Sequence, residues 1–171
     1  MGYSTEYLGY LTVTPPLNPA EVEWVNGFAD WGALPDGDPF HLPMNPRAAL
    51  RRAFAAKGGV MTSCSTVPRG VRDWRASTDG SRIAWRRSEK SNDAVQTLRY
   101  LVEHYLGPEA RAMTCEGEEF AGFTFDHRLD GVLAAARDDT DELFLITVVA
   151  SVIETQTLVR PHPSSLLLAD C

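Results

Sequence analysis

The amino-acid sequence predicts an α+β fold, a single-domain two-layer sandwich in which two main helices pack on one mostly antiparallel or mixed sheet. The first observation is a hairpin signal, because two alternating segments flank the dipeptide Asp79-Gly80. The second is a pair of helix-start signals, at Asn18-Pro19 and at Ser91-Asn92-Asp93, which lie between strand-like segments. Helices interspersed with hairpin-linked strands are typical of this class.

The composition is that of an ordinary globular protein. The chain has 171 residues, of which 44% are hydrophobic and 23% charged, so one sizeable core can form. We expect one domain over residues 1–171, with a variable helical or loop insert at about 34–71 and an irregular tail from about 160. The net charge of -7 argues against nucleic-acid binding and suits a partner with a basic surface.

Several features favour a cytoplasmic protein without a cofactor or a membrane partner. The segment Met1 to Glu6 has neither a basic leader nor an apolar run, so we expect no signal peptide. Cys64, Cys115 and Cys171 are too few and too widely spaced for a disulfide scaffold or a zinc ribbon. The longest apolar run, Leu143 to Ile153, is shorter than the roughly 20 residues that a membrane span needs.

The first third of the chain contains a strand and one or two helices. Tyr3 to Val13 alternates in a strand pattern, which Pro15-Pro16 ends. The segment Asn18-Pro19-Ala20-Glu21 supplies a capping residue, a proline at the first helical position and a capping-box glutamate, so a helix begins there and ends near Gly32. Further along, Asn45-Pro46 repeats the start signal before a short helix over Arg47 to Lys57, and Val60 to Arg69 fits either loop or strand.

The hairpin register follows from the turn. If Asp79 and Gly80 are the two loop residues of a type I′ turn, the opposed residues are fixed. The predicted pairs are Thr78 with Ser81, Ala76 with Ile83, Trp74 with Trp85 and, on the other face, Asp73 with Arg86. The apolar face of this hairpin is the expected floor for the second main helix.

The second main helix covers Ala94 to Leu106 and ends at Gly107-Pro108. Ser91-Asn92-Asp93 supplies two capping side chains and an acid at its start. The segments after it combine β-branched or aromatic residues with polar turns, which predicts further strands. These strands are Met113 to Glu116, Phe120 to Asp126, Gly131 to Arg137 and Leu143 to Thr155.

A set of residues spread over about two thirds of the chain resembles a family of small uncharacterised proteins from bacteria and their phages. These residues are Met1-Gly2-Tyr3-Ser4-Thr5, Pro15-Pro16-Leu17, Trp74, Asp79-Gly80, Ile83, Trp85, Glu89-Lys90 and Tyr100 to His104. The resemblance implies the fold but supplies no activity and no catalytic residue. The segment from Asp36 to Val71 and the tail after Glu154 depart from the family pattern.

The best acid/base cluster is Asp126-His127 with Asp130 nearby, and His104 approaches it if the long helix packs on that part of the sheet. A histidine oriented by a carboxylate can act as a general base or bind metal. The plainer interpretation is a turn between strands at Asp126 to Gly131, where these residue types favour the backbone geometry. His104 has its own explanation, because it complements the dipole at the end of a helix.

Three further features have structural explanations that we prefer. Asp138 to Glu142 is rich in carboxylates but lacks EF-hand spacing, so we interpret it as a solvated hairpin turn. Cys64 lies among hydroxyl residues without a family signature for a nucleophile, so we expect it to be inert. The tryptophans are expected to pack in the core, and they are Trp24, Trp31, Trp74 and Trp85.

The leading functional hypothesis is a non-enzymatic intracellular protein of bacterial or phage origin that binds a protein partner as an accessory, inhibitory or immunity-type factor. The candidate interaction surface is the charged face of the hairpin, formed by Asp73, Arg75, Arg82 and Arg86. One alternative is a small hydrolase whose catalytic residues are His127, Asp126 and His104. Another alternative is a structural subunit of a larger assembly.

Overall fold

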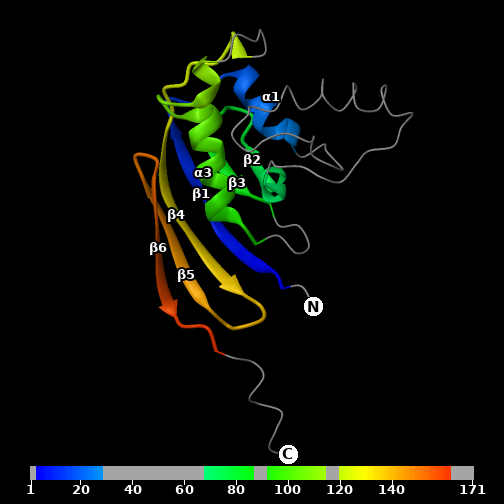
Figure 1. The fold of residues 1–171 in the computed structure, drawn as a ribbon, viewed down its shortest axis with the longest axis vertical. Helices are drawn as coiled ribbons and strands as arrows, with labels where there is room; N and C mark the ends of the chain where they lie inside the picture. Colours follow the sequence, from blue (N-terminus) through cyan, green and yellow to red (C-terminus); the bar gives the residue numbers. More distant parts are fainter. Residues whose placement is uncertain (1–2, 29–67, 87–91, 115–119, 163–171) are drawn as a thin grey trace, which may run out of the picture.

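A computed structural model describes residues 3–28, 68–86, 92–114 and 120–162, and within them it confirms the α+β fold (Figure 1). The strands are β1 (Thr5–Thr14), β2 (Trp74–Ala76), β3 (Arg82–Trp85), β4 (Arg128–Arg137), β5 (Leu143–Val149) and β6 (Val152–Val159). The helices are α1 (Pro19–Gly27) and α3 (Ala94–Leu101), with short turns η2 (Arg69–Asp73), η3 (Val102–Leu106) and η4 (Arg111–Thr114). The strands form one antiparallel sheet in the order β2-β3-β1-β4-β5-β6.

The sheet is covered by helices on one face, which we call the inner face. Residues Leu11 and Val13 of β1 are buried there, whereas Leu8 and Tyr10, at positions of the opposite parity, are exposed on the other, outer face. The same alternation continues across the ten-residue pairing of β1 with β4. The core therefore lies between the inner face and the helices, as the two-layer prediction requires.

Helix α1 begins as the sequence predicts. The Asn18 side chain accepts hydrogen bonds from the backbone N–H groups of Ala20 and Glu21, at 2.9 and 3.2 Å, and the Glu21 carboxylate accepts one from the Asn18 N–H. Trp24 lies in the core against Tyr105, with ring centroids 5.4 Å apart. The capping box thus fixes the start of the helix and turns its apolar face toward the core.

The structure describes α1 only as far as its end at Gly27 and the following residue. Three predictions therefore lie outside the described residues: the helix end at Gly32, the short helix over Arg47 to Lys57 and most of the insert at 34–71. The next described residue is Pro68, which directly precedes the turn η2.

The hairpin register is confirmed, with Trp74 opposite Trp85 and Ala76 opposite Ile83. The two tryptophan rings meet edge to face at 5.1 Å, and the Trp74 Nε1–H donates to the Thr97 hydroxyl of α3 at 2.9 Å. The predicted floor for the long helix is therefore present.

The predicted turn type is wrong. A type I′ turn needs positive φ at both central residues, but Gly80 has φ +70° while Asp79 is not among the described non-glycine residues with positive φ. The loop is wider, because the Ser77 carbonyl accepts from the Gly80 N–H and the Ser77 N–H donates to the Arg82 carbonyl. The Asp79 carboxylate stabilises this wider loop by accepting from the backbone N–H of Ser81 at 3.1 Å. Thr78 and Ser81 consequently belong to the loop and not to the ladder.

Helix α3 is confirmed, and it continues as the π-helical turn η3 up to Leu106 before Gly107 ends it. Asp93 precedes the helix but makes no side-chain cap hydrogen bond, and the predicted capping residue Ser91 lies outside the described residues. The Asn92 side chain is used elsewhere, since its Nδ2 donates to the Tyr3 carbonyl and its Oδ1 accepts from the Thr5 hydroxyl. Asn92 therefore ties the start of α3 to β1.

The last part of the chain differs from prediction in three segments. Residues 111–114 form the 3-10 turn η4 instead of a strand, and 120–127 form no strand because their N–H groups bond elsewhere, including to the Glu21 carboxylate. The predicted strand Leu143 to Thr155 is split by a two-residue turn at Ala150 and Ser151, which have φ 48° and 69°. The strand predicted at Gly131 to Arg137 is confirmed as part of β4.

The described residues include no helix whose length and apolar character would allow it to span a membrane.

Candidate functional site

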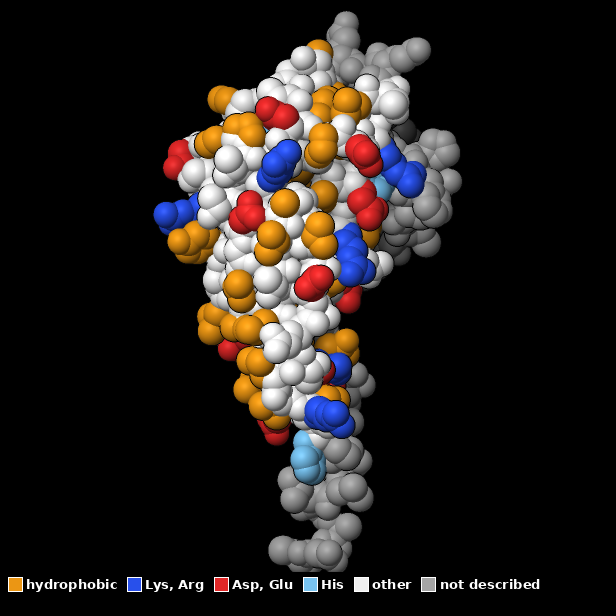
Figure 2. All heavy atoms as spheres, turned by 90° about the vertical axis from the view of Figure 1, so that its left-hand side faces the viewer, with side chains coloured by type: hydrophobic (Ala, Val, Ile, Leu, Met, Phe, Trp, Pro, Cys, Tyr) orange, Lys and Arg blue, Asp and Glu red, His pale blue; other side chains and the backbone are white. Residues whose placement is uncertain are grey.

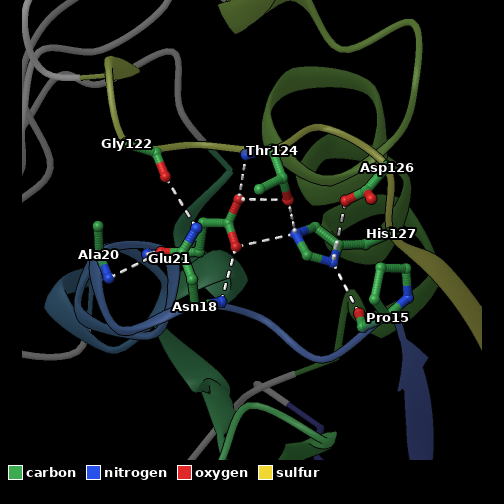
Figure 3. A network of polar contacts seen from close by, with 8 residues as sticks. All are labelled: Pro15, Asn18, Ala20, Glu21, Gly122, Thr124, Asp126 and His127. Atoms are coloured by element: carbon green, nitrogen blue, oxygen red, sulfur yellow. Dashed lines mark hydrogen bonds and ion pairs between the residues drawn. The ribbon is translucent and has the colours of Figure 1, made fainter.

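The most prominent buried polar group is His127, which lies directly before β4 with 1% of its surface exposed. Its Nδ1 lies 2.8 Å from the Pro15 carbonyl oxygen, and its Nε2 lies 2.9 Å from Glu21 Oε2 and 3.1 Å from the Thr124 hydroxyl (Figure 3). The ring therefore joins three separate segments: the end of β1, helix α1 and the strand-free segment 120–127.

Glu21, the second member of this pair, is fully buried. Its Oε1 accepts from the Thr124 N–H at 2.7 Å, and its Oε2 accepts from the Asn18 N–H at 2.8 Å as well as contacting His127. A buried carboxylate needs such donors because it has lost its water. The capping-box signal placed Glu21 at the helix start, but the sequence contained no signal that paired it with His127.

The contacts define the protonation state of the pair. A carbonyl oxygen can only accept, so His127 Nδ1 carries a proton and donates it to Pro15. Burial lowers the pKa of His127, but the hydrogen bonds to Glu21 and Pro15 outweigh burial and hold that pKa above its ordinary value. Burial likewise raises the pKa of Glu21, and hydrogen bonds from His127, Thr124 and Asn18 outweigh it, so that pKa lies below its ordinary value. Both pKa directions favour the charged forms, an imidazolium facing a carboxylate.

Of the other predicted members of the acid/base cluster, only Asp126 lies near this pair (Figure 3). Asp126 Oδ1 is 3.9 Å from His127 Nδ1, and its side chain is 57% exposed. His104 lies in η3, where its Nδ1 bonds the Tyr100 carbonyl at 2.9 Å and its ring stacks on the Tyr100 ring. Asp130 accepts from the Ala150 N–H at 2.8 Å, which is a turn contact. The structure thus pairs His127 with Glu21, and it places Asp126 at the margin of the pair.

A cavity of about 500 Å³ lies beside α3, and His104 lines it whereas His127 does not. Its aromatic wall is formed by Tyr7, Tyr100 and Phe144, and Arg99 lies among its charged lining residues. Burial raises the pKa of the Tyr100 phenol to about 12, so this hydroxyl stays protonated at neutral pH. The cavity and the His127 pair are therefore separate features of the molecule.

The predicted charged surface on the hairpin is only partly accessible. Asp73 is buried, and Arg75 is half-buried with its guanidinium donating to the backbone carbonyls of Arg72 and Trp74. Arg82 and Arg86 are exposed, and the Arg82 guanidinium lies over the Tyr10 ring at 4.5 Å from its centroid. As an interaction surface this set stays a prediction, with Arg82 and Arg86 as its exposed members.

The acidic segment Asp138 to Glu142 joins β4 to β5 as a turn, as expected. Asp139 receives two hydrogen bonds from the Arg137 guanidinium, at 3.0 and 2.8 Å. In the described part of the chain, no group of three or more His, Cys, Asp or Glu side chains is arranged to hold a metal ion. Cys64, Cys115 and Cys171 lie outside that part.

The tryptophans that the structure describes pack in the core, as predicted. Trp24, Trp74 and Trp85 are at most 8% exposed, and Trp31 lies outside the described residues.

The outer face of the sheet carries an uncovered apolar surface. We call it the outer patch; it consists of Leu8, Tyr10, Val132, Val149 and Val152. Leu8, Val149 and Val152 are each more than 60% exposed, and Val132 lies directly opposite Tyr10 in the β1–β4 ladder. Viewed from the side on which β6 lies, the molecule shows apolar side chains spread among single charged groups (Figure 2). Large exposed apolar patches mark interaction sites in folded proteins.

Stability should depend on pH through the buried pair. The pKa of Glu21 is lowered in the folded protein. Ionised Glu21 therefore stabilises the folded state at pH values above its unfolded-state pKa of 4.5, and this stabilisation is lost as the pH falls through the folded-state pKa. The pKa of His127 is raised in the folded protein. Protonated His127 therefore stabilises the folded state at pH values below its unfolded-state pKa of 6.5, and this stabilisation is lost as the pH rises through the folded-state pKa. Urea unfolding at several pH values should therefore give the largest difference between wild type and Glu21→Gln at pH 4.5 to 6.5. A difference that keeps growing above that window would contradict the ion pair.

Comparison with models of known protein families, with curated proteins and with solved structures found no match. The family resemblance of the sequence therefore stays a prediction.

Proposed function

We propose that this protein acts by binding a protein partner and not by catalysis. The observation that carries the proposal is the outer patch, whose apolar side chains project from a rigid sheet and have no covering layer among the described residues. Such surfaces supply the desolvated centre of protein interfaces. An accessory, inhibitory or immunity-type role of an intracellular protein of bacterial or phage origin fits this mode of action.

The site geometry favours binding over hydrolysis. His127 is enclosed, and both of its ring nitrogens are engaged by Pro15, Glu21 and Thr124. A general base must reach the proton that it removes from a substrate, directly or through one water molecule. An imidazolium buried against a carboxylate has neither the access nor the free lone pair for that work. We therefore assign the pair to holding the fold.

Charge indicates the kind of partner. The chain carries a net charge of -7, and the exposed residues Glu6, Asp130 and Glu154 lie on the strands that bear the outer patch. A partner with an apolar centre and a basic rim would bury the patch and be steered by the acidic field. Such steering weakens as salt is added.

The experiment is a comparison of tagged variants expressed in the source cells. Leu8→Lys with Val132→Lys places two cations within the outer patch, at exposed positions whose substitution leaves the core intact. Wild type should retain a stoichiometric partner that the double variant loses, with the circular dichroism spectrum unchanged. Gln96→Lys, at an exposed position of α3, is the matched control and should retain the partner. A partner that the double variant retains, or no stoichiometric partner for wild type, would contradict the proposal.

A further inference from the structure

The two edges of the sheet differ in whether their backbone N–H and C=O groups already have hydrogen-bond partners. At the β2 edge, the Asn26 carboxamide of α1 donates to the Ala76 carbonyl at 3.1 Å and accepts from the Ala76 N–H at 2.9 Å. One amide side chain thus takes the hydrogen bonds that a neighbouring strand would make. The β2 strand is also only three residues long, so this edge offers little to another chain.

The β6 edge has less protection among the described residues, where its pairing with β5 is regular from Val152 to Thr157 and irregular only between Thr157 and Val159. It is eight residues long and pairs on one side with β5, and no described strand pairs with its other side. Glu154 is the single ionisable residue between Leu143 and Val159, and this segment contains no proline or lysine. Natural proteins normally block an exposed edge with charges, prolines or a very short strand. A long, nearly uncharged edge of β-branched residues is therefore suited to pairing.

The β5–β6 turn identifies the groups available for pairing. Ala150 and Ser151 both have positive φ, as in a type I′ turn, and the residues that flank it, Val149 and Val152, are opposed. In a two-residue hairpin that flanking pair exchanges hydrogen bonds, and hydrogen-bonded pairs recur at every second position. The backbone groups of Ile153, Thr155 and Thr157 therefore point away from β5.

We propose that β6 pairs with β6 of a second copy, antiparallel and centred on Thr155, so that two sheets join into one. This inference goes beyond the proposed function, because it uses an edge of the sheet and not the outer patch. In this register Ile153 lies opposite Thr157 of the other copy, and Glu154 lies opposite Gln156. The central pair, Thr155 with Thr155, is of a type that stabilises sheets, and no like charges meet.

The second copy is the occupant that the edge itself specifies. Two-fold pairing requires a strand that is complementary to itself, and the outward groups Ile153, Thr155 and Thr157 are symmetric about Thr155. A register centred on Glu154 would oppose two carboxylates, so charge selects against that alternative. The helices do not obstruct pairing, because β6 lies at the opposite side of the sheet from β2 and α1 (Figure 1).

The test measures mass in solution by sedimentation over concentrations from about 1 µM to about 1 mM. We expect wild type to reach twice the chain mass of 18.8 kDa. Thr155→Pro removes an N–H that points away from β5, and Thr155→Lys places a cation at the centre of the pairing. Each variant should raise the dimer dissociation constant about tenfold or more.

Thr12→Lys is the matched control, because Thr12 is an equally exposed threonine on the interior strand β1. It should leave the dissociation constant unchanged, and circular dichroism should be the same for all variants. A wild type that stays monomeric over the whole range overturns the proposal. So does a dimer that survives both substitutions of Thr155 but is lost in Leu8→Lys with Val132→Lys, because that result would assign self-association to the outer patch.

Discussion

Gly80→Ala should lower the free energy of unfolding by about 2–5 kcal/mol, one of the largest effects of any single methyl group in this chain. Gly80 has φ +70°, and a Cβ built there would lie 2.0 Å from the Leu17 carbonyl oxygen. The Leu17 N–H donates to the Gly80 carbonyl at 3.0 Å, so the hairpin loop and the segment after β1 are held together. The added methyl group would force these two backbones apart.

Gly122→Ala is the control for this substitution. Its Cβ would meet the Ala20 side chain at 3.5 Å, an ordinary contact, and Gly122 is exposed. We expect a change within about 0.5 kcal/mol in the same urea titration. Equal effects of the two substitutions would show that the close approach of Gly80 to Leu17 does not determine the cost.

Glu21→Gln should cost about 3–5 kcal/mol of unfolding free energy near pH 6, because it leaves the buried His127 cation without its counter-ion. The substitution keeps the shape of the side chain and removes its charge. Urea unfolding at fixed pH measures the loss. Glu23→Gln, at an exposed position of the same helix, is the matched control and should change the stability by about 0.5 kcal/mol or less.

A double-mutant cycle separates the pair from the helix cap. Because Glu21 also accepts the Asn18 N–H, part of the loss in Glu21→Gln belongs to the start of α1. His127→Phe removes the cation and keeps a ring. If the ion pair is real, the double substitution should cost less than the sum of the two single ones. Strict additivity would argue that Glu21 and His127 do not interact.

The parts of the fold that the sequence predicted correctly are those set by local chemistry. The capping box at Asn18 and Glu21 fixes the start of α1, because its hydrogen bonds join residues three apart. The pairing of Trp74 with Trp85 was predicted correctly, although the turn type was predicted wrongly. The turn type does not change this pairing, because any loop that keeps Ala76 opposite Ile83 also places Trp74 opposite Trp85.

The errors arise where tertiary contacts or unusual turn residues determine the local backbone structure. The turn at Ala150 and Ser151 contains none of the glycine, asparagine or aspartate residues that usually adopt positive φ, so it was predicted to lie inside one strand. The backbone of Leu129 stabilises this turn, since its carbonyl accepts from the Ser151 N–H and its N–H donates to the Ser151 hydroxyl. Only the neighbouring strand supplies those contacts.

The candidate site shows the same division. The sequence paired His127 with its neighbour Asp126, and these two side chains do lie 3.9 Å apart. The closer contact, to Glu21 at 2.9 Å, joins residues 106 positions apart and was not predicted. A contact between residues so far apart in the chain is made by the folding of the whole chain. It leaves no local pattern that can be recognised in a single sequence.

The side chain of Asn26 determines how large an assembly of this protein can become. A protein whose two sheet edges both accept strands can add copies without limit and form a fibre, whereas one receptive edge permits a single closed pair. The Asn26 carboxamide occupies the hydrogen-bonding groups of Ala76 at one edge. If β6 pairs with a second copy as we propose, the Asn26 amide and the shortness of β2 leave no second receptive edge among the described strands, so the assembly would close at two copies.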